Sequence, residues 1–126
     1  IGKAYSNFSY TKACTCINLQ TSSRQFREKY TKAGEAPGFT QAGTMVSTMN
    51  GELLPIAGGV LIRERGNEEG LSTILGAVGI SVASADEDEY LALVGTKNAF
   101  NIPLDSEDDG VIITFPPKHS CTTLKE

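Results

Sequence analysis

The double glycine Gly58-Gly59 is the feature of the sequence whose backbone is best suited to binding an anion. It precedes a run of apolar and β-branched residues at 60–62, and glycine at such a place indicates a bulge or a close approach of the backbone. Backbone N–H groups exposed at a glycine bulge can bind a carboxylate or an oxyanion. The same pattern would arise if the bulge only turned the sheet, and the sequence favours neither interpretation.

Side chains with reactive groups do not form a catalytic pattern. The single histidine, His119, lies in the tail, so neither a histidine-ligated haem nor a histidine-based triad is predicted in the body of the chain. Cys14 and Cys16 would project from different faces of a helix, and we interpret them as buried or half-buried thiols rather than metal ligands. The acidic run at 86–89 is expected to stabilise the first turn of a helix, not to bind a metal.

Length and composition indicate one globular domain. The chain has 126 residues, of which 40% are apolar and 21% charged, as in ordinary globular proteins. Its formal net charge of −4 argues against an extended nucleic-acid surface, and no apolar run is long enough to span a membrane. The cysteine pattern favours a reducing, cytoplasmic compartment. Because the sequence begins without methionine, we expect a processed chain or one shown without its upstream residues.

Local patterns predict several elements that would position these groups. Helices are expected over residues 22–33 and 85–99, the second with Ser84 and Glu87 as a capping box and an apolar side formed by Tyr90, Leu91 and Val94. Residues 14–19 and 33–43 are predicted to be irregular. Strands are predicted over 44–49, 53–63 and 74–83, with Asn50-Gly51 as a hairpin turn between the first two. An acidic linker at 105–110 leads to a strand-like run at 111–115.

Several motifs resemble the GlcG/HbpS-like haem-binding, haem-degrading family. Three runs, Gly58-Gly59-Val60-x-Ile62, Gly76-Ala77-Val78-Gly79-Ile80-Ser81 and Asp86-Glu87-Asp88-Glu89, are similar to its Gly-Gly-Val-Pro-Ile, Gly-x-Ile-Gly-Val-Ser and Glu-Gln-Asp-Glu. Lys3-Ala4-Tyr5-Ser6 resembles its Lys-Ala-Tyr-Thr helix, and residues 50–55 resemble the run before its double glycine. The resemblance covers residues 3–100 and is most specific over 51–89.

This resemblance implies an α+β fold, in which helices pack on an antiparallel sheet of three to five strands as a profilin-like sandwich. The family-like domain would span residues 1–104, and residues 105–126 would form the acidic linker and a tail strand. Family members usually carry a helix and two strands before the Lys-Ala-Tyr helix, and this sequence starts at that helix. We therefore expect an obligate oligomer, either with a second chain that carries those elements or with further copies of this chain.

A ligand cavity near the double glycine is also implied by the resemblance. The residues expected to bind a small-molecule ligand there are Lys3, Tyr5, Phe39, Thr40, Gly58, Gly59 and Arg63. Two function classes follow. The first is an enzyme that reuses the cavity for an isomerisation or cyclisation by proton transfer and shape, with no catalytic residue assigned. The alternative is a binding module for haem or a related planar cofactor. The absent histidine and the divergent ends favour the enzyme.

Overall fold

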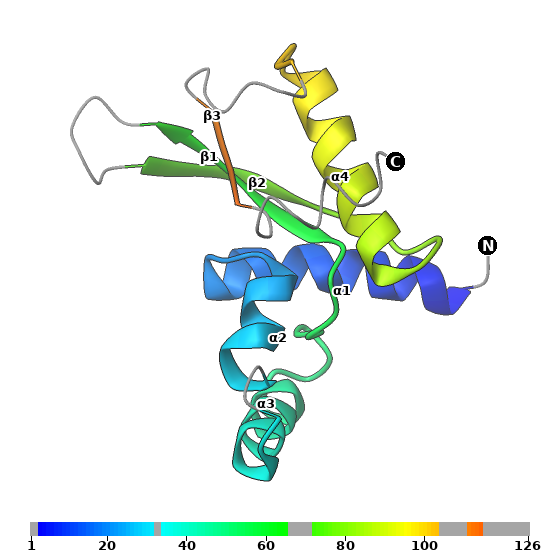
Figure 1. Ribbon diagram of the computed structural model, residues 1–126, viewed down its shortest axis with the longest axis vertical. Helices are drawn as coiled ribbons and strands as arrows, with labels where there is room; N and C mark the ends of the chain where they lie inside the picture. Colours follow the sequence, from blue (N-terminus) through cyan, green and yellow to red (C-terminus); the bar gives the residue numbers. More distant parts are fainter. Residues whose placement is uncertain (1–2, 32–33, 66–71, 104–110, 115–126) are drawn as a thin grey trace.

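The computed structural model describes residues 3–31, 34–65, 72–103 and 111–114, and its elements are labelled in Figure 1. The helices and strands, in chain order, are α1 (Lys3–Leu19), α2 (Ser23–Thr31), α3 (Ala36–Thr48), β1 (Gly59–Arg65), β2 (Ser72–Gly79), α4 (Ala85–Ala99) and β3 (Val111–Thr114). The described strands form one sheet in the order β2-β1-β3, and both neighbours of β1 run antiparallel to it. The α+β class expected from the sequence is confirmed.

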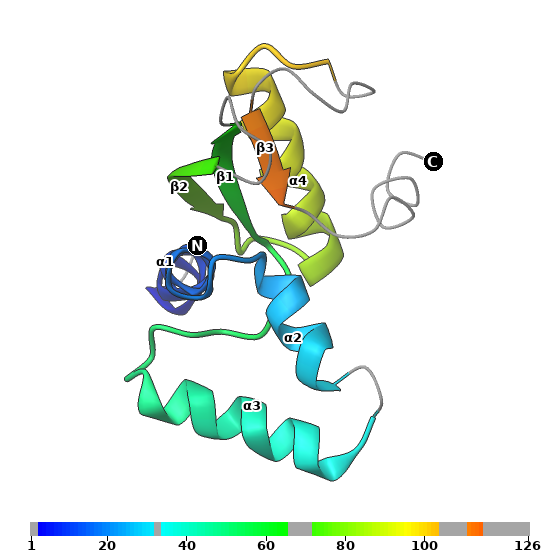
Figure 2. The same cartoon turned by 90° about the vertical axis from the view of Figure 1, so that its left-hand side faces the viewer.

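The sheet lies between two helices, α1 on one face and α4 on the other (Figures 1 and 2). On the α4 side, Val60 and Val78 pack with Ala92 and Leu93 of the helix. On the α1 side, β1 and β2 pack against the helix backbone at Gly59 and Gly79. Helix α2 contacts α1 and β1, whereas α3 packs on α2 at the end of the molecule away from the sheet.

A bulge in the β1–β2 hairpin changes which side chains share a face. Gly76 pairs with Ile62 and Ile74 pairs with Arg63, so Leu75 is the extra residue in β2. Period-two alternation predicts that Ile74 and Val78 lie on the same face. The extra residue makes that prediction wrong, because Ile74 now shares a face with its partner Arg63, on the α1 side. Glycine beside Leu75 is consistent with the bulge that the glycine-rich strand predicted.

Two sequence predictions are wrong here, the irregular segment 33–43 and the strand 44–49, because residues Ala36–Thr48 form helix α3. Pro37 lies in the first turn of the helix, where a missing N–H is tolerated, and does not form a turn. The hydroxyl groups of Thr44, Ser47 and Thr48 each donate to a backbone carbonyl four residues earlier, which lets these strand-favouring residues stay helical. Asn50 and Gly51 then have left-handed φ angles of 51° and 81°, which end the helix instead of forming a hairpin.

Three further boundaries differ from the sequence predictions. Residues 14–19 continue α1, because Thr15 and Cys16 are fully buried against the rest of the fold and packing outweighs their modest helix propensity. Residues 53–58 precede β1 and are not part of it. Helix α4 spans the residues predicted and begins at Ser84, whose hydroxyl accepts from the Glu87 N–H at 3.3 Å. Its buried side, however, consists of Asp88, Glu89, Ala92, Leu93, Thr96 and Lys97 rather than the predicted apolar set.

Candidate ligand-binding site

The double glycine lies where α1 comes closest to the sheet. A Cβ on Gly59 would lie 2.6 Å from the carbonyl oxygen of Lys12 and 2.9 Å from the sulfur of Cys16. Gly58 has a φ of +128°, and a Cβ there would lie 2.7 Å from both Lys12 Nζ and the Ile80 oxygen. The N–H of Gly59 already donates to Ser23 Oγ at 2.9 Å. The two glycines therefore admit α1 and its lysine, and this close approach is the structural reason for glycine at both positions.

Lys12 and Asp88 form a buried ion pair beneath the double glycine. The Lys12 Nζ donates to Asp88 Oδ2 at 3.1 Å and to the carbonyl oxygen of Ile80 at 2.8 Å, and both side chains are 2% exposed. The other oxygen of Asp88 accepts from the N–H groups of Val82 and Ala83. The pair thus ties α1 to the end of β2 and the start of α4. The acidic run was expected to act through the helix dipole alone; Asp88 instead has this specific buried role.

A second ionic contact joins α2 to α4. Arg24 Nε donates to both carboxylate oxygens of Glu89, at 2.9 and 3.0 Å, and its Nη2 pairs with Asp86. Burial raises the pKa of the Glu89 carboxyl above its ordinary value, and the guanidinium of Arg24 opposes this shift. Because the hydrogen bonds to Arg24 engage both oxygens, the contact holds the two helices in a fixed orientation.

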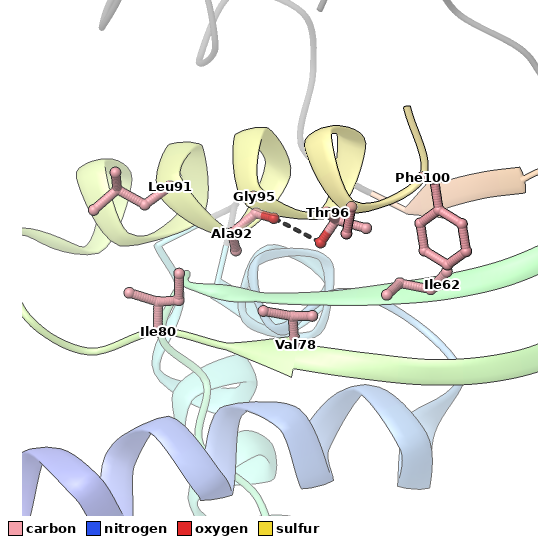
Figure 3. A pocket seen from close by; sticks show the side chains of 9 residues that line it. Ile62, Val78, Ile80, Leu91, Ala92, Gly95, Thr96 and Phe100 are labelled. Carbon is pink, nitrogen blue, oxygen red and sulfur yellow. Dashed lines mark hydrogen bonds between the residues drawn. The ribbon is translucent and has the colours of Figure 1, made fainter. Parts of the chain in front are cut away.

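An apolar groove lies between α4 and the sheet, on the face opposite α1 (Figure 3). Its volume is about 290 Å³, and the residues that line it are Ile62, Val78, Ile80, Leu91, Ala92, Gly95, Thr96, Ala99 and Phe100. Thr96 carries its one polar side chain, and that hydroxyl donates to the carbonyl oxygen of Ala92 at 2.7 Å. A Cβ on Gly95 would meet nothing within 4 Å, so the groove is open at this turn of the helix.

The seven residues predicted to bind a ligand lie in separate parts of the fold. Lys3 and Tyr5 are exposed near the start of α1, and Phe39 and Thr40 are exposed on α3. Arg63 is half-buried on β1, and its Nη2 donates to the carbonyl oxygen of Gln20 at 3.2 Å. Gly58 and Gly59 lie together under Lys12. None of the seven lines the apolar groove.

Lys12 lies in a short sequence pattern that also occurs near the start of α1. Lys12-Ala13-Cys14-Thr15 repeats the Lys-Ala-x-Thr pattern nine residues after Lys3-Ala4-Tyr5-Ser6. It is this second copy whose lysine contacts Gly58 and whose threonine hydroxyl accepts from the Leu54 N–H at 2.8 Å.

The described residues contain neither a metal-binding cluster nor a membrane-spanning helix. No cluster of three or more His, Cys, Asp or Glu side chains within that part of the chain is arranged to hold a metal ion. No helix among those described combines the length and apolar character needed to cross a membrane. Cys14 and Cys16 are free thiols, half-buried and buried, as predicted, and burial raises the pKa of Cys16 to about 12.

Comparison with known proteins places the chain in one family. Neither the curated proteins nor the solved structures yield a match to it. A family model described as haem degrading protein HbpS-like matches residues 3–97, which run from the start of α1 to the last turn of α4. This span includes the double glycine, the buried ion pair and most of the apolar groove. The chain therefore belongs to the HbpS-like haem-degrading family.

Proposed function

We propose that this protein binds a flat apolar ligand of the porphyrin class in the groove between α4 and the sheet. The observation that carries the proposal is the lining of the groove, in which every side chain except Thr96 is apolar or absent. The Thr96 hydroxyl already donates its hydrogen to the helix backbone, so the groove presents an almost wholly hydrophobic surface. Membership of a haem-degrading family supports a porphyrin as the ligand class.

The groove lining can contact the apolar ring of a porphyrin but offers no side chain to coordinate its iron. Haem iron in proteins is held by His, Cys, Met or Tyr, and the residues that line the groove include none of these. A volume of about 290 Å³ lies at the lower end of the range for ligand pockets, so the groove would cover part of a macrocycle and leave its carboxylates in water. We therefore infer recognition through the apolar face of the ring, without a bond from this groove to the metal.

The groove gives less support to the alternative, an isomerase or cyclase that acts by proton transfer. Such chemistry needs an acid or base within hydrogen-bond reach of the substrate, and no lining side chain of the groove titrates in the ordinary range. Lys12 and Asp88 do not line the groove, and their side chains form an ion pair with one another. The enzyme class thus remains a prediction without a catalytic group to assign.

Filling the groove at Gly95 should abolish porphyrin binding while the fold survives. We expect Gly95→Leu to weaken the affinity for iron-free protoporphyrin at least tenfold, because the new side chain would occupy the open space over Val78 and Ala92. Leucine is favoured over glycine in a helix interior by about 1 kcal/mol, so the melting temperature should hold or rise. Fluorescence titration and thermal melting of the same samples measure both effects.

A matched control for this variant exists on α3. Gly43 is also an exposed helix glycine with nothing within 4 Å of its Cβ position, and it lies far from the groove on a helix that packs on α2. Gly43→Leu should raise helix stability to a similar degree and leave porphyrin affinity unchanged. Equal affinity in both variants and the parent would place the ligand outside the groove and refute the proposal.

We also infer that the protein assembles through the edge of β2 that is paired with no described strand, with a second copy of the chain as the partner. The N–H of Ile80 donates to Gly58, so alternation along the strand directs the N–H and C=O groups of Ala77 and Gly79 away from β1. β2 carries no charged residue to discourage pairing, and Leu75 is 49% exposed. An antiparallel pair of identical strands satisfies the same groups in both copies, as a two-fold dimer requires.

Light scattering after size-exclusion chromatography tests this assembly. The parent chain should elute as a dimer or larger oligomer, and Leu75→Lys should shift it toward the monomer, because a charge at the edge opposes strand pairing. A monomeric parent at micromolar concentration would contradict the inference. Copurification of a different polypeptide in place of a second copy would contradict it as well.

A further inference from the structure

A second and smaller pocket lies where α1, the segment before β1 and the start of α4 meet. We call it the Ser81 pocket. Its volume is about 100 Å³, and its lining residues are Phe8, Lys12, Leu54, Ile56, Ser81, Ala83, Ala85 and Asp88. It shares no residue with the apolar groove. Phe8 and Ile56, at its rim, are each 43% exposed, so the pocket is reached from solvent past two apolar side chains.

The hydroxyl of Ser81 points to a ligand in this pocket. Ser81 is only 6% exposed, yet its hydroxyl has no hydrogen-bond partner among the described residues. No side-chain nitrogen or oxygen shielded from solvent lacks a partner in the described part of the chain, so the Ser81 oxygen is reached from the pocket. The hydroxyl is therefore open to the pocket with no protein group bonded to it, and a ligand atom there would meet it directly.

Lys12 supplies a second group to the same pocket. Its ammonium has three N–H bonds, and two of them are directed to Asp88 Oδ2 and the Ile80 carbonyl oxygen. The third has no acceptor among the described contacts, and Lys12 lines the pocket. Asp88 adds little repulsion, because Lys12 and the N–H groups of Val82 and Ala83 already compensate its carboxylate. The exposed acids nearest on α4, Asp86 and Glu87, do not line the pocket.

The groups that the pocket offers are therefore mostly donors. The Lys12 ammonium and the Ser81 hydroxyl converge there, and α4 begins at its rim with Ala85, where backbone N–H groups lack helical acceptors. The remaining walls, Phe8, Leu54 and Ile56, are apolar. We propose that the Ser81 pocket binds a short-chain carboxylic acid, its carboxylate on Lys12 and Ser81 and its alkyl chain against the apolar rim. The available volume suits an acid of about two to four carbons.

Binding of butyrate to the full chain tests this proposal, with butyramide as the uncharged match of the same shape. Chemical-shift titration of backbone amides should show saturable changes with butyrate at Ser81, Ala83 and Ala85, with a Kd in the millimolar range expected for so few atoms. Butyramide should bind at least fivefold more weakly, since it lacks the charge that Lys12 favours. Equal binding of the two compounds, or no saturable shift with butyrate, would overturn the proposal.

Variants locate the site and separate it from the porphyrin groove. Ser81→Ala should weaken butyrate at least threefold and keep the melting temperature, because the hydroxyl has no partner to lose. Ser47→Ala, on exposed α3, should leave butyrate affinity unchanged. Gly95→Leu should leave butyrate affinity intact, so the groove proposal and this one can fail independently. Unchanged butyrate affinity in a folded Ser81→Ala protein would contradict the assignment.

Discussion

Replacing Gly79 with alanine is expected to lower the free energy of unfolding by about 3 kcal/mol, the upper range for forcing extra atoms into a packed interior. A Cβ at this position would lie 2.0 Å from the Ser9 carbonyl oxygen and 2.9 Å from the Ala13 nitrogen. Both are backbone atoms of α1, which cannot rotate away as a side chain can. The helix would have to move off the sheet and would carry Lys12 with it.

Gly76 provides the control within the same strand. A Cβ there meets nothing within 4 Å, so Gly76→Ala should change the unfolding free energy by less than about 1 kcal/mol, with alanine favoured by its smaller loss of chain entropy. Urea unfolding followed by circular dichroism measures both variants. Similar midpoints for the two would show that α1 does not contact β2 as described. Gly59→Val should likewise unfold the domain, because Gly59 faces the same helix.

Removing the carboxylate of Asp88 should be equally damaging. We expect Asp88→Ala to cost about 3–5 kcal/mol, the usual effect of breaking a buried ion pair, because it leaves the Lys12 ammonium and two backbone N–H groups without their acceptor. Glu87→Ala is the matched control one residue earlier. That side chain is exposed, and its loss should cost less than about 1 kcal/mol of interaction with the helix dipole.

The double variant Lys12→Met with Asp88→Leu separates an unpaired charge from general damage to the core. Replacing both partners with apolar side chains of similar size is often tolerated where removing one is not. We therefore expect thermal melting of the double variant to recover at least half of the loss seen in Asp88→Ala. A double variant less stable than Asp88→Ala would mean that the pair stabilises the fold in another way.

Features encoded by neighbouring residues could be predicted from the sequence. The bounds of α4 follow from Ser84 as the cap and the acids behind it, and the glycines of β2 indicated the bulge and the close approach that the structure contains. Helix α3 was missed because its local signals conflict: Pro37-Gly38 favours a turn, and the threonines after it favour a strand. What settles the conflict is packing on α2, which no local pattern reports.

The candidate sites depended on contacts between distant segments, and these the sequence did not reveal. Lys12 and Asp88 are 76 positions apart, and each has the appearance of a solvated surface charge when it is considered with its neighbours alone. The groove left a weak signal, since Ala92, Gly95, Thr96 and Ala99 are small residues at helical spacing on one side of α4. Of the predicted apolar side of this helix, Leu91 lines the groove, whereas Tyr90 and Val94 do not.

The relative affinity of the parent protein for hemin and for iron-free protoporphyrin tests the central proposal most directly. If the groove recognises the apolar face of the ring and supplies no iron ligand, the two dissociation constants should agree within about threefold, and the hemin complex should lack the Soret shift of a protein-ligated iron. Hemin binding at least tenfold tighter than the free ring, with such a shift, would contradict the account. It would place the ligand at an iron-binding side chain outside the groove between α4 and the sheet.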